Sequence, residues 1–411
     1  MTLVNIVSAL GNNNSVYPLL VRDCGIENVA KVALTYKQNA KDSKFIAKQA
    51  TRERAIDEYG TSAVWLGGIP ILNAICDKAI QKTGLSPKVN LKLFKETQAQ
   101  GIEYNIKKFK NLAPREVQDL IKVKDNKKLY QNSQIAKFFA TTAIPIAIMG
   151  FVLPKLNYLY TKKKMDERKN VQTLRPQSLI EFKQNANKIN FTGIEKLANM
   201  SNLEKMMILD GGLTVGRVKT ARNKAEKAEM AFKMAGMCYL NYLAPKSIEK
   251  GLNAITKKLF GLNTDLDIKT LADKNFAEQI KSGKLSLPKD VDEKTLLDFI
   301  DNNADSFFTT QAKNTGIVST LKNGIRDPRK YVECEQLAKL KGAIEEFSTQ
   351  AKNSGNIDSF IKKAISAKCF NTLANVGLSS VLLAIVLPKL QFLFRKITQG
   401  TNLDPGVREY K

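Results

Sequence analysis

The sequence predicts an all-α protein that is associated with a membrane and built from a tandem duplication. Three observations predict it: a nine-residue motif that occurs twice, an uncharged apolar stretch before each copy of this motif, and helical periodicity over most of the remaining chain. Residues 154–162 (PKLNYLYTK) recur as residues 388–396 (PKLQFLFRK). No alternation of apolar and polar residues continues long enough to indicate a sheet.

Each copy of the motif completes an apolar stretch without charges, residues 138–154 and residues 369–388. An apolar helix followed by aromatic rings and then by lysine is typical of a chain that leaves a bilayer. A membrane span needs about 20 residues, and the second stretch has 20. The first has 17, but Lys137 and Lys155 extend it, because lysine side chains reach along apolar surface to water.

These two exits supply the residues that we expect at the membrane interface. Their aromatic rings suit the depth of the head groups, and their basic side chains suit anionic lipid. The candidates are Lys155, Tyr158, Tyr160, Lys162, Lys163, Lys164, Lys389, Phe392, Phe394, Arg395 and Lys396.

Two further apolar segments are weaker candidates for spans. Residues 60–76 are uncharged but contain Gly67, Gly68 and Pro70, and residues 234–245 form a shorter stretch. We therefore expect two to four hydrophobic helices in the bilayer. The alternative for each segment is a buried helix in a large helical core.

The repeat extends weakly beyond the nine-residue motif and predicts how the chain is organised. The first repeat covers about 1–165, a basic linker covers 166–189, and the second repeat covers 190–411. The second repeat contains a polar helical insertion at about 260–360, which is the more acidic part of the chain.

A short acidic motif recurs near the start of each repeat, at residues 23–26 (DCGI) and 210–213 (DGGL). We expect each aspartate to cap a turn in which Gly25 or Gly212 has positive φ. The alternative is a paired acidic site between the repeats.

The polar regions are predicted to form amphipathic helices. In the clearest example, Ile248, Leu252, Ile255 and Leu259 share one helical face, and lysines occupy the other faces.

The two exits also constrain the topology. Short basic flanks of a span tend to stay in the cytoplasm. We therefore expect both exits to face the same compartment, with an even number of embedded segments separating them. The repeats would then be related by an axis along the membrane normal. The predicted location is a membrane, with the basic regions cytoplasmic.

The composition favours anionic partners. The net charge is +26, from 65 basic and 39 acidic residues. Such a surplus suits anionic head groups, an acidic protein or nucleic acid. The lysines are spread along the chain, however, which is more typical of solvated faces. No nucleic-acid recognition motif occurs, and the aromatic residues of the exits suit a membrane interface better than base stacking.

The sequence gives little support to an enzyme. It contains no histidine, which removes histidine-based acid–base catalysis, Ser-His and Cys-His pairs, and histidine metal ligands. The five cysteines form no CxxC pair, and their odd number indicates a reducing compartment. We expect no catalytic residues, no metal and no cofactor.

The leading functional hypothesis is a non-enzymatic, membrane-anchored structural or interaction protein whose basic helical surface meets anionic lipid, an acidic partner or a second copy. One alternative is a small transporter or pore built from two repeats, and another is a soluble basic helical protein that binds nucleic acid. Coupled transport usually requires an intramembrane charge. The polar residues of the two strongest apolar stretches are not ionisable: Thr141, Thr142, Asn371, Thr372, Asn375, Ser379 and Ser380.

Overall fold

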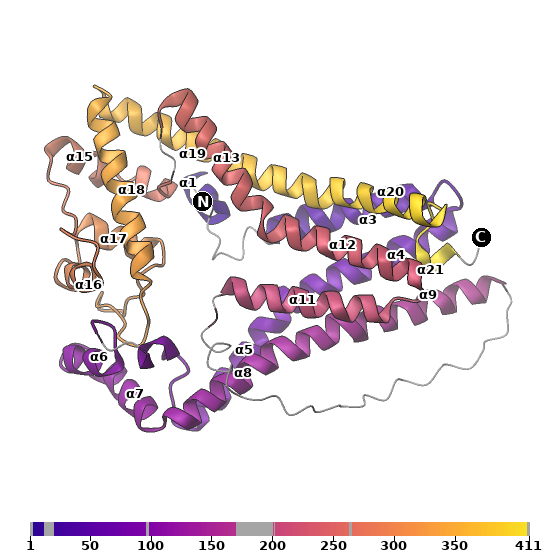
Figure 1. The fold of residues 1–411 in the computed structure, drawn as a ribbon, viewed down its shortest axis with the longest axis horizontal. Coiled ribbons are helices and arrows are strands. Elements are labelled where there is room, and N and C mark those ends of the chain that lie inside the picture. The colour runs from indigo at the N-terminus through magenta and orange to yellow at the C-terminus, as the bar shows by residue number, and fades with distance from the viewer. Residues whose placement is uncertain are drawn as a thin grey trace. The chain divides into compact units, whose positions relative to one another are not determined.

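A computed structural model describes residues 3–11, 20–95, 98–169, 200, 202–262 and 265–408. Within these ranges the chain forms helices and turns and no strand, apart from one isolated antiparallel bridge between Thr320 and Arg326. The predicted all-α class is therefore confirmed. The chain divides into two compact units (Figure 1). Unit 1 comprises residues 1–18, 77–134 and 245–376, and unit 2 comprises residues 19–76, 135–244 and 377–411.

The following elements lie in unit 1, wholly or for most of their length: α1 (Leu3–Gly11), the 3₁₀ turn η3 (Leu91–Phe94), α6 (Ile102–Phe109), α7 (Pro114–Asp125), α13 (Ala244–Phe260), α14 (Ile268–Leu271), α15 (Lys274–Ser282), α16 (Glu293–Asn302), α17 (Phe307–Asn314) and α18 (Cys334–Asn353). The insertion predicted at about 260–360 is helical and has an apolar core, in which the Phe276 and Phe307 rings stack at 4.5 Å. Aspartates begin three of its helices, because Asp267, Asp273 and Asp292 accept hydrogen bonds from backbone amides in the first turns of α14, α15 and α16.

Unit 2 contains α3 (Asn28–Asn39), α4 (Lys44–Ala63), α9 (Leu153–Lys169), α11 (Asn202–Thr220), α12 (Lys224–Tyr242), α20 (Leu387–Gln399), α21 (Pro405–Arg408) and four π-helical turns, η1 (Leu20–Glu27), η2 (Val64–Gly68), η4 (Ile148–Val152) and η6 (Leu382–Val386). Three helices belong partly to each unit: α5 (Ile69–Lys82), α8 (Lys127–Ala147) and α19 (Ile357–Val381).

A π-helical turn precedes a proline in each of the three longest helical segments. The turns η2, η4 and η6 end two residues before Pro70, Pro154 and Pro388. Proline lacks an N–H, and its ring would clash with the carbonyl four residues earlier in a regular α-helix. In each case the residue before the proline donates to the carbonyl five residues back, as Leu387 does to Leu382, which widens the turn and lets the helix continue.

The π-helical turns bear on the predicted repeat, because Pro154 and Pro388 begin its two copies of the nine-residue motif. Pro70 shares its backbone setting with Pro154 and Pro388, whereas the proline that ends the apolar segment 234–245 does not. Pro245 lies in the first turn of α13, just after the end of α12. The compact units do not follow the predicted repeats either, because each unit takes segments from both. The repeat boundaries remain a prediction about the sequence.

The helices of unit 2 have a definite direction relative to one another. Along α11, Gly212 lies against Ile146 and Gly216 against Gly150, so α11 runs parallel to the segment α8–η4–α9. Helix α12 returns antiparallel to α11, and α20 is antiparallel to α12, because Gly236 lies beside Leu387 and Glu229 beside Arg395. Helices α9 and α20 therefore run in the same direction within unit 2.

The two predicted aspartate turns are helical instead. Residues 23–26 lie in η1, and residues 210–213 lie inside α11. Neither Gly25 nor Gly212 has a positive φ. The glycines of α11 serve helix contact: a Cβ on Gly216 would lie 2.8 Å from the Gly150 Cα atom. Glycines spaced four residues apart permit such an approach of two helix backbones, as in membrane helix pairs.

Candidate membrane surface and buried charge network

Three helical segments are long and apolar enough to cross a membrane, judged by length and composition among the described residues. They are Lys44–Lys82, Lys127–Glu167 and Ile357–Gln399, and they contain the predicted segments 60–76, 138–154 and 369–388. Within the most apolar part of each, only 6%, 28% and 39% of the residues are buried. The fourth predicted segment, 234–245, lies mainly in α12 and is not among them.

The outward faces of these three segments are apolar. Ile71 on α5 is 61% exposed and Ile75 is 57% exposed. Further exposed apolar side chains on the parts of the segments that belong to unit 2 are Phe139, Ile144, Ile148, Val152, Leu156, Leu159, Leu378, Val381, Val386, Leu390, Leu393 and Ile397. Single exposed apolar residues are ordinary on a soluble protein, whereas extended apolar faces mark interaction surfaces.

The predicted interface residues fall into two groups. Lys162, Lys163, Lys389 and Lys396 are exposed, and Tyr160 is 47% exposed. Lys155, Lys164, Tyr158, Phe392 and Phe394 are partly buried. The Arg222 guanidinium lies 4.0 Å from the Tyr158 ring centroid, and Phe394 stacks on Phe232 at 4.8 Å.

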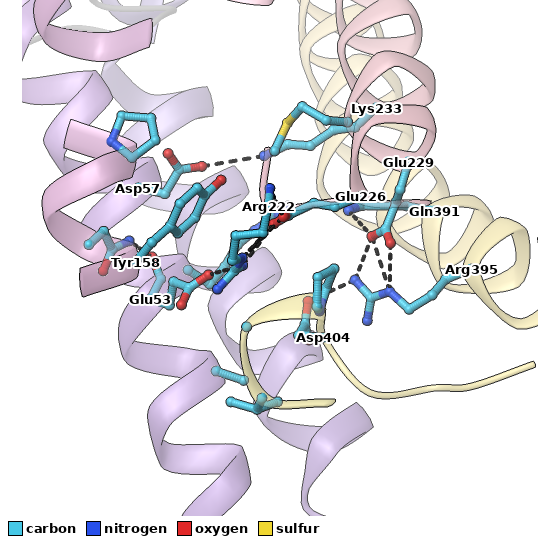
Figure 2. Close-up of a pocket in the computed structure, with 18 residues that line it drawn as sticks. Glu53, Asp57, Tyr158, Arg222, Glu226, Glu229, Lys233, Gln391, Arg395 and Asp404 are labelled. Atoms are coloured by element: carbon cyan, nitrogen blue, oxygen red, sulfur yellow. Dashed lines mark hydrogen bonds and ion pairs between the residues drawn. The ribbon is translucent and has the colours of Figure 1, made fainter. Parts of the chain in front are cut away.

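Arg395 is fully buried, so in this structure it does not lie at the surface. Its side chain forms a fork with Glu229: Nη2 donates to Oε1 at 2.6 Å and Nε donates to Oε2 at 2.9 Å (Figure 2). Arg395 Nη2 also donates to Asp404 at 2.7 Å, and Gln391 donates to Glu229 at 2.7 Å. Paired N–H···O bonds of this kind are among the strongest that side chains form.

Arg222 joins a second pair of carboxylates beside this fork. It begins the turn before α12 and donates through Nη2 to Glu226 at 2.7 Å and to Glu53 of α4 at 2.8 Å. The C-terminal segment covers the pair, because a Cβ on Gly406 would lie 2.4 Å from Arg222 and 2.6 Å from Glu53. Asp404 fixes this segment by accepting from Asn39 at 2.6 Å.

A third group of charges lies between α3, α4, α11 and α12. Lys233 Nζ lies 3.0 Å from Glu58 and 3.6 Å from Asp57, and Arg217 lies 2.7 Å from Asp57. Lys31 contacts Glu58 at 3.3 Å and also pairs with Glu27, while Arg54 lies 3.0 Å from Glu58.

This third group holds more cations than anions. Lys31, Arg54, Arg217 and Lys233 face Glu27, Asp57 and Glu58. Burial, with the nearby Arg54 adding to it, lowers the pKa of Lys233 to about 8, although Glu58 and Asp57 oppose the shift. Burial would also lower the pKa of Lys31, but Glu58 and Glu27 outweigh it and raise that pKa. Of the two lysines, Lys233 therefore releases its proton first.

A small cavity lies among these charged groups (Figure 2). Side chains of α4, α9, α12 and α20 and the C-terminal residues 404–407 line it, and its volume is about 60 Å³. That is room for a few water molecules, whereas pockets for organic ligands measure about 300–1,000 Å³. The described residues contain no cluster of cysteine or carboxylate side chains suited to a metal ion.

The polar residues named in the apolar stretches are not the ionisable groups that unit 2 buries. Thr141 and Thr142 are buried, but their hydroxyls donate to carbonyls of their own helix. The buried ionisable groups of unit 2 come mainly from α3, α4, α11, α12 and α20, and they pair over sequence separations such as 166 residues for Glu229 and Arg395. One signal was present: Glu226, Glu229 and Lys233 recur on one face of a helix whose other residues are mostly apolar.

No protein-family model, curated protein or solved structure matches this chain. Two features of unit 2 bear on its function: the exposed apolar side chains of its long helical segments and the charged side chains buried between its helices.

Proposed function

We propose that the protein is a membrane-embedded, non-enzymatic structural or interaction protein. Unit 2 is the embedded part, and unit 1 is the part that stays in water and meets a partner. The observation that carries the proposal is the exposure of apolar side chains along three long helical segments, of which the first has 6% of its most apolar residues buried.

Elementary energetics support this assignment. Each Å² of apolar surface left in water costs about 25 cal/mol relative to burial, and lipid chains can cover faces that no other part of the chain covers. A membrane protein must also pair any charge that it places between its helices. The buried cations Arg395, Lys233 and Arg217 meet this condition, since each contacts at least one carboxylate.

The proposal includes the duplication and the orientation predicted from the sequence. The parallel direction of α9 and α20 supports two exits on one side of the membrane. We place that side in the cytoplasm, because basic flanks favour it. Lys162, Lys163, Lys389 and Lys396 are exposed and are the residues that would meet anionic head groups or an acidic partner.

A surface substitution tests the proposal. Ile71→Arg changes a side chain that is 61% exposed, so a protein in water should tolerate it within about 0.5 kcal/mol. In a bilayer, an arginine near the centre of a span costs about 2.5–3.5 kcal/mol. We expect Ile71→Arg to reduce the membrane-inserted fraction strongly. Val291→Arg is the matched control, since Val291 is 57% exposed in unit 1 and should tolerate the change. Equal tolerance at both positions would contradict the proposal.

The buried charge network favours a second candidate, a carrier of protons or small ions. Lys233 and Glu58 lie 3.0 Å apart between helices, and the small cavity beside them has room only for water or a small ion. Reconstituted protein should then dissipate a pH gradient across vesicles, and Lys233→Met should abolish the flux without preventing insertion. No flux above that of protein-free vesicles would reject this candidate and leave the anchoring function in place.

A further inference from the structure

Helix α13 exposes part of its apolar face, whereas a surface helix of a protein in water usually packs its apolar face against the core. Thr256 is its buried residue in the contact with α19, where the Asn371 amide donates to the Thr256 hydroxyl at 3.0 Å and to Asn253 at 3.2 Å. Two polar side chains of α13, Thr256 and Asn253, therefore face α19. The apolar residues Ile255, Leu259 and Phe260 are 54%, 66% and 67% exposed, while Ile248 and Leu252 are half-buried.

The apolar residues form one stripe. Ile248, Leu252, Ile255 and Leu259 follow helical spacing along α13, and the stripe lies beside the buried contact rather than in it. The charges of the helix are mainly positive, with Lys246, Lys250, Lys257 and Lys258 against Glu249. One of these lysines, Lys257, pairs at the surface with Glu346 of α18 at 3.3 Å. An apolar stripe opposed by lysines is typical of helices that lie in the plane of a membrane surface.

The position of α13 along α19 agrees with this interpretation. The helices meet at Asn371, just after Lys368 ends the charged part of α19 and Cys369 begins the uncharged stretch 369–388. Phe370 and Leu373, on either side of Asn371, are 67% and 48% exposed. The crossing therefore lies at the level where a spanning helix would enter the bilayer from water.

We propose that α13 is an in-plane membrane anchor, whose stripe enters the boundary between head groups and acyl chains and whose lysines contact anionic head groups. The inference rests on the proposed function in one respect, that residue 369 marks the edge of a bilayer. It adds a lipid contact in unit 1, away from the two exits. The occupant is a bilayer rather than a second protein because the apolar surface continues from α13 onto the apolar stretch of α19, and because the helix is basic.

Fluorescent labels on the two faces of α13 test the proposal in the full-length chain. In a background without the five native cysteines, Leu259→Cys and Lys250→Cys would each carry a nitrobenzoxadiazole label in vesicles of phosphatidylcholine with or without phosphatidylserine. We expect the label at position 259 to be quenched by nitroxide-labelled lipid and shielded from aqueous iodide. The label at position 250 should show the reverse.

Lys257→Gln with Lys258→Gln tests the role of charge. In the parent protein, shielding at position 259 should increase with phosphatidylserine, and the double variant should lose that increase. Each lysine near an anionic surface contributes about 1 kcal/mol, so two should change the partition of the helix by on the order of tenfold or more. Unchanged helical circular dichroism and elution volume would show that each variant has folded.

Three results would overturn the proposal. The labels at 250 and 259 could be equally accessible to iodide, position 259 could be shielded without quenching by lipid nitroxide, or shielding could be independent of phosphatidylserine. The second result would indicate protein–protein contact. A label at Ile71→Cys separates this proposal from the previous one: lipid quenching at 71 but not at 259 rejects only the anchor, whereas quenching at 259 but not at 71 rejects only the embedding of unit 2.

Discussion

Unit 1 and unit 2 differ in the side chains that they bury most completely. In unit 1 the buried side chains are mainly apolar and aromatic, among them Phe276, Phe308 and Phe347, and many ion pairs lie at the surface, such as Lys281 with Asp358. In unit 2 the largest fully buried side chains include Arg395, Lys31 and Lys233, while isoleucine and leucine residues are exposed. Unit 1 also buries charges, in the pairs Arg326–Asp301 and Arg329–Asp327, but most of its largest buried side chains are aromatic, whereas those of unit 2 include three cations.

This difference in buried side chains is the one expected if unit 1 lies in water and unit 2 lies in lipid, as proposed. In water, burial of apolar side chains drives folding, and charges remain at the surface. In lipid, apolar side chains gain little from burial, and helices associate through close packing and polar contacts. Unit 2 shows both signs of the second case, the Gly150–Gly216 approach and the charge network. The following experiments test this contrast, from the largest expected effect to the smallest.

The largest effect is expected from breaking the Arg395–Glu229 fork. Arg395→Met would leave the buried Glu229 carboxylate and the half-buried Asp404 carboxylate without their cation. Removal of one partner from a buried ion pair costs about 3–5 kcal/mol. We expect a large loss of thermal stability in detergent, and a partial recovery in the double variant that also carries Glu229→Met. A loss in the double variant equal to that in Arg395→Met would show that the charges are independent of each other.

A smaller effect is expected from filling the closest helix approach. Gly216→Ala places a methyl group 2.8 Å from the Gly150 backbone, which cannot rotate away as a side chain would. Overpacking of this kind costs about 1–3 kcal/mol. Gly211→Ala on the same helix is the control, because its Cβ would meet nothing within 4 Å. Unfolding of both variants should be followed in the same detergent, and similar midpoints would argue against a tight α11–η4 contact.

The last experiment varies the pH. Lys233 has its pKa lowered to about 8 in the folded protein, from an ordinary value of 10.5. At low pH both states carry the proton, and the cost of burying the charge is fully present. Between these two values the folded state releases a proton that the unfolded state keeps, so stability should rise with pH. Lys233→Met should remove this rise. A stability curve with the same slope in the parent and the variant would assign the rise to another group.

The sequence predicted the helical class and the apolar segments because both depend on local pattern. Residues 60–76, 138–154 and 369–388 each lie in a long helical segment, as the absence of charge indicated. The π-helical turns before Pro70, Pro154 and Pro388 were not predicted, although proline and an uninterrupted apolar pattern on both sides were the available signal.

The charge network of unit 2 could not be predicted from local sequence pattern, because its partners are far apart in the sequence. Arg395 belongs to a basic cluster in the sequence and was therefore assigned to the surface, but its carboxylate partner Glu229 lies 166 residues away. The closing of the cavity by Asp404 and Gly406 depends likewise on contacts with α3 and α4. Such pairings are set by the packing of the whole unit and not by any one segment.

The central claim is that unit 2 is embedded in a bilayer, and alkaline carbonate extraction of membranes from cells that express the full-length chain tests it most directly. High pH strips proteins that are held only by charge, including those held by exposed lysines such as Lys162 and Lys396, but leaves spanning helices in place. We predict that the protein remains in the membrane pellet and is released only by detergent. Recovery of the protein in the carbonate supernatant as a folded, monodisperse species would contradict the account.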